Sequence, residues 1–328
     1  MNYLRFTEKM MPDASALLAQ RHIRNRVELP ELPVRFETMS ETVKAIETLQ
    51  TKQSTSGFAA LRDGKLIAYL IGETIVQPWG RCGYIYLPGY GLAEGENPEI
   101  IQDLYALLGE EWNQKGCFHH YTYICAADKD IVETWFNLGF GKERVDALLD
   151  LRSAKIPEVE MPAGISLRRV VKGDNDYLSS LSDTIWRHQT KAPRWHPMTP
   201  EEIMEQPEGW AGIADTESDM AYLAFEAKEV VGSLAFYVQE ETVDDMTTPT
   251  HCRYMTAAAT KESVRGRGIG TALTWYGLKQ IRESGDEYCL TNWQSANLLA
   301  TRFWPRFGFK PVAFRLARLI DPNIAWAK

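Results

Sequence analysis

The sequence predicts a mixed α/β (α+β) protein built from two related domains. Its 328 residues correspond to about two domains of ordinary size. Stretches with the periodicity of strands are interspersed with stretches of helical periodicity. The order of these stretches in the first half of the chain recurs in the second half. With 45% hydrophobic residues, including 12 Phe, 10 Trp and 14 Tyr, the chain can bury two full-sized cores.

The second half predicts a series of strands and helices that includes one antiparallel hairpin. The hairpin joins strands at 221–225 and 230–237 through the tight turn 226–229. In chain order, the other predicted elements are a strand at 165–169, a helix from about 174 through 186, a strand at about 253–259, a helix at 271–283, a strand at 288–293, a helix at 296–306 and a closing strand at 312–320.

The first half repeats this order. Its hairpin, 58–61 and 66–69 around the turn 62–65, corresponds to the hairpin of the second half, and Trp135–Phe140 matches Trp304–Phe309. A weak repeat that relates the two halves of the chain indicates two copies of a single domain. The polar segment 152–163, with two prolines, is the natural linker. We therefore expect domains at 1–151 and 164–328.

The composition limits which kinds of binding partner and which cellular compartment fit this protein. The net charge of −8 disfavours nucleic acid or an anionic membrane as the main partner. No apolar stretch approaches the 18 residues that a membrane span needs. The five cysteines form no CxxC pair, so we expect no structural zinc, no other metal and no disulfide framework, and a reducing cytoplasm fits best.

One glycine-rich motif carries chemistry. Residues 263–271 (SVRGRGIGT) follow a predicted strand and open a predicted helix. Three glycines in five positions let the backbone approach a ligand, and the exposed N–H groups, with Arg265 and Arg267, would form a nest for an anion such as pyrophosphate. The absence of GK[ST] excludes a nucleotide P-loop, and the GxGxG spacing argues against a dinucleotide site. A glycine-rich turn without a ligand is the alternative.

The motif and its surroundings resemble the GNAT superfamily of acetyl-CoA-dependent N-acetyltransferases. The family pattern [QR]xxGx[GA] is met by Arg265 to Gly270, and the later signature is met by Asn297, Trp304 and Gly308-Phe309. The resemblance covers 164–328. It implies two tandem GNAT-like domains, each a mixed, mostly antiparallel sheet flanked by helices, with acetyl-CoA as co-substrate and catalysis in the second domain.

The resemblance also implies which residues hold the cofactor. Asn297 would bind the pantetheine arm, with a helix N-cap as the alternative role. Trp304 stands where the family often has a tyrosine acid, and we expect it to pack beside the CoA thiol, because an indole cannot supply a proton at neutral pH. Backbone near Ala258 and Thr260 would pair with the pantetheine. The pyrophosphate cradle would consist of Arg265, Gly266, Arg267, Gly268, Ile269, Gly270 and Thr271.

The first copy departs from the pattern at the cofactor site. It offers the segment 93–99 (AEGENPE) in place of the glycine cradle and Asp128 in place of Asn297. Carboxylates at that place would repel a pyrophosphate. We therefore expect a degenerate, non-catalytic domain. The adjacent His119 and His120 are interpreted as structural residues, because neighbours on a strand point to opposite faces.

Catalytic and acceptor residues are less constrained by the sequence. His251 and Tyr254, before and on the strand preceding the cradle, are the candidates for the base. Trp195 and His196 lie in an irregular, aromatic-rich segment that would wall the acceptor pocket. Residues 201–250 hold 13 acidic residues and one basic residue, Lys228, so a cationic acceptor would be attracted if this region borders the cleft.

These observations predict a monomeric or homodimeric N-acetyltransferase. It would move an acetyl group from acetyl-CoA to a primary amine of a small molecule or peptide by direct attack. Two alternatives stay open: a CoA-binding regulatory protein without turnover, and a transferase of a larger acyl group.

Overall fold

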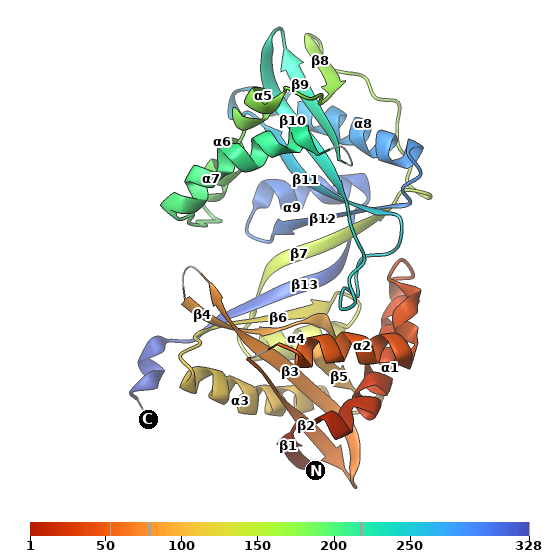
Figure 1. Ribbon diagram of the computed structural model, residues 1–328, viewed down its shortest axis with the longest axis vertical. Helices are drawn as coiled ribbons and strands as arrows, with labels where there is room; N and C mark the ends of the chain where they lie inside the picture. Colours follow the sequence, from red (N-terminus) through yellow and green to blue (C-terminus); the bar gives the residue numbers. More distant parts are fainter. Residues whose placement is uncertain (53, 78–79, 217–218, 328) are drawn as a thin grey trace. The chain divides into compact units, whose positions relative to one another are not determined.

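The computed structural model describes residues 1–52, 54–77, 80–216 and 219–327, and the chain divides into two compact units (Figure 1). Unit 1 comprises Met1–Asp146, Glu241–Pro249 and Pro311–Lys328, and unit 2 comprises Ala147–Glu240 and Thr250–Lys310. None of the helices in the described ranges combines the length and the apolar character that crossing a membrane requires. All five cysteines are buried free thiols.

Unit 1 is a mixed, mostly antiparallel sheet. Its strands β1, β2, β3 and β4 pair antiparallel in that order, β4 pairs in parallel with β6, and β6 pairs antiparallel with β13. The short strand β5 pairs with β3. The bounds are Asn2–Arg5 (β1), Thr55–Arg62 (β2), Lys65–Gln77 (β3), Gly80–Ile85 (β4), Tyr90–Leu92 (β5), His119–Cys125 (β6) and Lys310–Leu319 (β13).

Helices cover both faces of the unit 1 sheet (Figure 1). Helices α1 (Met11–Glu28) and α2 (Met39–Gln50) pack their apolar side chains with Tyr69 and Ile71 of β3. On the other face, α3 (Glu99–Gln114) and α4 (Lys129–Asn137) enclose a core with Trp112 and Trp135. The alternation of side chains along each strand supplies one apolar row to each of these cores.

Unit 2 repeats the arrangement. Strands β8, β9, β10 and β11 pair antiparallel in that order, and β11 pairs in parallel with β12. Helices α5 and α7 pack on one face, where Trp210 joins the core, and α8 packs on the other. The bounds are Ile165–Arg169 (β8), Met220–Glu226 (β9), Glu229–Val238 (β10), Cys252–Thr260 (β11), Tyr288–Gln294 (β12), Asn175–Ser179 (α5), Asp183–Gln189 (α6), Pro200–Ala211 (α7), Ile269–Glu283 (α8) and Leu298–Phe303 (α9). The predicted fold class is confirmed in both units.

The close approach of α8 to the sheet depends on Gly277. A Cβ atom placed there would lie 2.6 Å from the ring of Phe236 and 2.8 Å from Leu234, both on β10. Any larger residue would therefore push α8 away from the strands. This packing fixes the first turn of α8 relative to the end of β11, where the glycine-rich motif lies.

The last strand of the first half ends in unit 2, and the last strand of the second half belongs almost entirely to unit 1. The strand β7 (Gly141–Asp150) ends in unit 2, where it neighbours β12 and where Leu151 N–H donates to the Glu287 carbonyl at 2.8 Å. The strand β13, near the C-terminus, pairs with β6 in unit 1, with Ala313 opposite Cys125 (Figure 1). A cut of the chain at 152–163 thus does not coincide with the boundary of the compact units.

The helix predicted from 174 through 186 is divided. Helix α5 ends at Ser179 and α6 begins at Asp183, because the serines between them bond locally: Ser180 Oγ donates to the Tyr177 carbonyl at 2.7 Å. Such side-chain bonds compete with a continuous helix. The helix predicted at 296–306 is shorter, since α9 gives way to a 3-10 turn at Trp304–Phe307.

Candidate functional site

Strands β11 and β12 of unit 2 separate part of the way along their length. Their parallel pairs run from Cys252 opposite Tyr288 to Tyr254 opposite Leu290. Beyond these pairs both strands continue, and among the described residues they no longer pair with each other, although β11 stays paired with β10. A bulge at Ala257, whose φ is +47°, shifts the register against β10. The two strands therefore diverge beyond Tyr254 and Leu290. This divergence leaves a wedge whose backbone groups can pair with an extended ligand.

The glycine motif forms a cradle at the open end of this wedge. Gly266 and Gly268 have φ values of +80° and +84°, the left-handed conformation that glycine adopts without a steric penalty. Gly268 is the N-cap of α8, and within the described chain no side chain accepts a hydrogen bond from the first-turn N–H groups. These N–H groups and the positive end of the helix dipole are suited to an anion such as pyrophosphate.

The two arginines of the motif are engaged in protein contacts. Arg265 Nε donates to the Thr260 carbonyl at 3.0 Å and so fixes the end of β11. Arg267 forms an exposed ion pair with Glu226 at 2.6 Å, which raises the pKa of Arg267 and lowers the pKa of Glu226. Their charge is therefore partly used within unit 2, and the backbone N–H groups remain as the main anion-binding element.

The remaining cradle residues divide into backbone donors and packing residues. The Ile269 side chain is buried with Val231 and Val264, so only its N–H can face a ligand. Thr271 is exposed on the first turn of α8. A Cβ atom on Gly270 would lie 3.2 Å from Thr260 Oγ1, so the end of β11 and the first turn of α8 approach each other closely.

Asn297 is the N-cap of a helix, which is the alternative role that the sequence offers for it, and it makes a second contact. Its Oδ1 accepts a hydrogen bond from Ala300 N–H at 3.3 Å, which caps α9, and it lies 3.1 Å from His188 Nε2. The next turn of chain places Lys191 in an ion pair with Glu262 at 2.8 Å. The end of α6 therefore contacts the segments that follow both arms of the wedge.

Trp304 is a packing residue in the structure. It is 8% exposed and forms an aromatic cluster with Phe303, Phe307 and Phe309. Ala258 and Thr260 lie on β11 beyond the bulge, half-buried and within the separated part of the strand.

The two candidate bases lie at different distances from the wedge. Tyr254 is the last residue of β11 paired with β12, and its hydroxyl accepts a hydrogen bond from Asn292. His251 is exposed, and it precedes the bulge at Ala257 by six residues, about 20 Å along an extended strand. Its backbone carbonyl accepts from Glu287 and Tyr288 N–H. Position favours Tyr254 over His251.

A cavity of about 330 Å³ lies beside the bulge, between α6–α7 and strands β10–β11. Thr256 and Ala257 belong both to the bulge and to its lining. His196 lines this cavity, whereas Trp195 is 70% exposed and lies outside the lining. Lining residues that the sequence reasoning did not select include Gln189, Glu202, Gln206, Trp210 and Tyr237.

In unit 1 the place that corresponds to the wedge, beside the end of β6, is filled by side chains of unit 1. Tyr90 is fully buried, and its hydroxyl lies 3.4 Å from both the Cys125 N–H at the end of β6 and the Asp128 carboxylate. Arg21 donates to the Tyr90 and Leu87 carbonyls and stacks on the Tyr90 ring at 3.8 Å. Burial raises the pKa of Asp128. The backbone that would meet a ligand is thus satisfied within unit 1.

The N-terminus of α3, where unit 1 would need an anion cradle, is capped. Asn97 Oδ1 accepts from Glu99 N–H at 3.0 Å, and Pro98 has no N–H to offer. Glu96 pairs with Arg62 at 2.9 Å. A capped helix end lined by carboxylates does not bind a phosphate group.

His119 and His120 do not converge. Both ring nitrogens of His120 have partners, with Tyr105 Oη at 2.7 Å and the Cys117 carbonyl at 2.9 Å. Burial lowers the pKa of His120 to about 4, so the ring is neutral at pH 7. His120 therefore acts as a buried structural residue.

The acidic residues Glu241 and Asp245, from the region 201–250, make contacts within unit 1. Arg35 pairs with Glu241 at 2.6 Å and donates to the Thr242 carbonyl at 2.7 Å. The Asp245 carboxylate accepts from the backbone and hydroxyls of Thr247 and Thr248. Neither carboxylate is part of the cavity lining.

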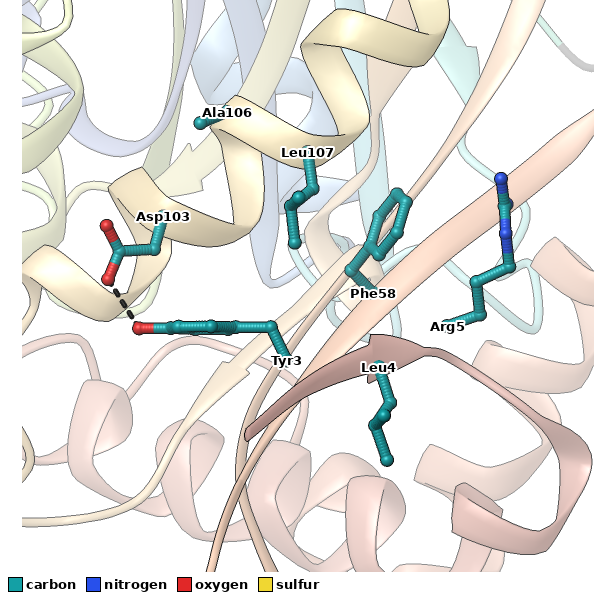
Figure 2. Close-up of a pocket in the computed structure, with 7 residues that line it drawn as sticks. All are labelled: Tyr3, Leu4, Arg5, Phe58, Asp103, Ala106 and Leu107. Carbon is teal, nitrogen blue, oxygen red and sulfur yellow. Dashed lines mark hydrogen bonds between the residues drawn. The ribbon is translucent and has the colours of Figure 1, made fainter. Parts of the chain in front are cut away.

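A second hollow lies on unit 1, between β1, β2 and α3 (Figure 2). The Tyr3 hydroxyl donates to Asp103 across it, and burial together with this contact raises the pKa of Tyr3 to about 12. Arg5 pairs with Glu111 at 2.9 Å. Because its polar groups are satisfied by one another, this hollow offers no set of groups aimed at a ligand.

Comparisons with known proteins agree with this geometry. Residues 183–309 match the family model described as Acetyltransferase (GNAT) family. A GCN5-related N-acetyltransferase from Sphaerobacter thermophilus is 18% identical with a TM-score of 0.59, and the match covers 98% of this chain and 96% of that one. A tandem GNAT protein from the clavulanic acid biosynthesis pathway is 13% identical with a TM-score of 0.51, covering 97% and 98%. No curated protein matches this chain. At these identities the solved structures show the shared tandem fold.

Proposed function

Since residues 183–309 constitute an acetyltransferase domain of the GNAT family, we propose that this protein transfers an acetyl group from acetyl-CoA to a primary amine in unit 2. The proposal rests on one observation: the wedge between β11 and β12 lies next to the uncapped, glycine-rich N-terminus of α8. Acyltransferase activity in general follows from the family. The acetyl donor and the amine acceptor are the specific part of the proposal.

The residues of the wedge would hold the cofactor in two parts. The N–H groups from Gly266 to Thr271 would bind the pyrophosphate, and the free edge of β11 at Ala258 and Thr260 would pair with the pantetheine amides. Bound acetyl-CoA would supply an acetyl thioester. The unprotonated amine nitrogen would bond to the carbonyl carbon, the C–S bond would break, and the proton lost by the nitrogen would pass to the sulfur, so that CoA leaves as the thiol. An N–H near the bulge at Ala257 would stabilise the oxyanion.

We assign proton transfer to Tyr254. It stands on the face of the sheet that borders the cavity, because it is paired with Tyr237, and Tyr237 and Thr256 both line that cavity. Asn292 donates to the Tyr254 oxygen and so orients the hydroxyl. Removing a positioned acid–base group reduces a rate by about 10²–10⁴-fold, so Tyr254→Phe should lower kcat by about that factor and His251→Ala should not.

The proposal is tested by thiol release from acetyl-CoA across a panel of amines, with calorimetric binding of acetyl-CoA measured in parallel. We expect release that depends on an amine. Binding without release for every acceptor would support a CoA-binding regulator instead, and release only from longer acyl-CoA donors would support transfer of a larger group. The five buried thiols fit a reducing compartment such as the cytoplasm.

Acetyl-CoA is expected to bind with a stoichiometry of one per chain. Unit 2 has an open wedge and a cradle, whereas in unit 1 Tyr90 and Arg21 fill the wedge and Asn97 caps α3. Isothermal calorimetry measures the ratio directly. Two equivalent sites per chain would contradict the assignment of unit 1 as non-catalytic.

A further inference from the structure

The cavity beside the bulge in unit 2 has a lining that is partly aromatic and carries a negative charge. It is bounded by α6 and α7 on one side and by β10 and β11 on the other. Two tryptophans, Trp186 and Trp210, line it together with one carboxylate, Glu202. The described residues of the lining include no Lys and no Arg.

Glu202 is held in place while part of its carboxylate stays available. It completes a capping box at the start of α7, in which Thr199 N–H donates to Oε2 at 2.7 Å and Glu202 N–H donates to Thr199 Oγ1 at 3.2 Å. No residue in the described chain donates a hydrogen bond to Oε1. A fixed negative charge with an available oxygen is a binding group for an ammonium.

The apolar part of the lining suits a flat body. Arg187 covers one face of the Trp186 ring at 4.7 Å, so only the other face is left for a ligand. Trp210 is 8% exposed and anchored in the unit 2 core with Leu178 and Leu181, which fixes its ring. Rigid aromatic walls pack well against an aromatic or planar apolar group.

The volume limits the size of the occupant. At roughly 30 Å³ for each water molecule, 330 Å³ is equivalent to about eleven waters, or a ligand of about a dozen non-hydrogen atoms. A polycyclic aminoglycoside exceeds this space. A polyamine such as spermidine is small enough to enter, but it has no flat body to lie against the tryptophans. Because Thr256 and Ala257 belong to both the cavity and the wedge, an amine seated here lies next to the separated strands.

We propose that the acceptor is a small primary amine with an aromatic or planar apolar body. Glu202 recruits its ammonium while its ring lies against Trp186 and Trp210, and the nitrogen gives up one proton to solvent before it attacks the thioester as the free amine. This inference rests on the proposed acetyl transfer and specifies its substrate class. 2-Phenylethylamine and tryptamine have the required size and charge and serve as probes.

The first test removes the charge and keeps the cap. Glu202→Gln retains a side chain that can complete a capping box, so the fold and acetyl-CoA affinity should be unchanged. The KM for 2-phenylethylamine should rise about tenfold or more, because a charge-assisted bond is lost. Glu201→Gln is the matched control: it makes the same charge change one residue away, on an exposed side chain outside the lining, and should leave KM unchanged. Equal KM values for both variants would overturn the role of Glu202.

The second test fills the cavity. Gly209 lines it, and a Cβ atom there would have no described atom within 4 Å, so Gly209→Leu fits the helix and narrows the cavity. We expect it to reduce kcat/KM for 2-phenylethylamine at least tenfold with unchanged acetyl-CoA binding. Gly212→Leu, in similarly open space but outside the lining, should behave like the unmodified protein. Full activity of Gly209→Leu would overturn the assignment of the cavity.

Failure of this inference is distinguishable from failure of the proposed function. Acetyl-CoA that does not bind, or binds without thiol release for any amine, would overturn both. Acetyl-CoA that binds and is consumed with spermidine, kanamycin or a peptide, but not with the two aromatic amines, would overturn the acceptor class while leaving acetyl transfer intact. A preference for the aromatic amines that is lost in Glu202→Gln and Gly209→Leu supports it.

Discussion

Gly268→Glu should lower the affinity for acetyl-CoA by about a hundredfold or more while the protein stays folded. The residue caps α8 with φ +84°, and its neighbouring N–H groups form the proposed pyrophosphate cradle. A glutamate would occupy the cradle with the wrong charge and displace at least two charge-assisted bonds, each worth about 1.5–3 kcal/mol. Calorimetry with acetyl-CoA measures the loss, and Gly270→Glu should act in the same way.

A matched control separates the cradle from backbone strain. Gly95 in unit 1 also has a left-handed φ of +79°, and a Cβ there has no described atom within 4 Å. Gly95→Glu therefore imposes a similar strain, of about 1 kcal/mol, in the segment that replaces the cradle. It should leave acetyl-CoA binding unchanged. Equal losses in Gly95→Glu and Gly268→Glu would mean that the cradle does not bind the cofactor.

Leu316→Ala should destabilise unit 1, although residue 316 belongs to the second half of the sequence. Leu316 lies on β13, is fully buried, and joins Ile124, Trp135 and Phe140 in the core beneath β6. Removing a buried leucine side chain costs about 3 kcal/mol in the free energy of unfolding. Amide hydrogen exchange should therefore lose protection in β6 and α3 and keep it in α8.

The control lies on the same strand. Leu319 is 68% exposed, so Leu319→Ala should change the free energy of unfolding by less than about 0.5 kcal/mol. If Leu316→Ala instead removed protection from α8 and β10 of unit 2, the pairing of β13 with β6 would be wrong.

The sequence predicts which segments form strands better than it predicts which strands pair with one another. Period-two alternation identifies 312–320 as a strand, and the structure has a strand at Lys310–Leu319. Alternation does not encode which edge the strand joins, because any apolar edge with matching register satisfies it. The place of β13 in unit 1 and of the end of β7 in unit 2 is therefore a property of the three-dimensional structure that alternation does not reveal.

The candidate site also contains local features that the sequence predicts and long-range contacts that it does not. The cradle was visible because Gly266 and Gly268 stand where only glycine is comfortable, and such positions are local in sequence. The contact between Asn297 and His188 joins residues 109 positions apart, and no local pattern predicts it, whereas the capping of α9 by Asn297 is local. Glu202 did leave a signal in the sequence: Thr199 followed three residues later by a glutamate is the signature of a capping box. That signature predicts a helix start, and only the cavity beside it turns the glutamate into a candidate ligand.

The placement of β13 sets an order on folding during synthesis. The sheet of unit 1 presents the edge of β6 once residue 125 has been made, and the strand that covers this edge ends at residue 319. At about 5–20 residues per second, the ribosome needs roughly 10–40 s to add the intervening chain. During that interval the nascent protein carries an uncovered strand edge and an incomplete core, the state in which chains aggregate. The core of unit 1 is therefore completed only after the second half of the chain has been made.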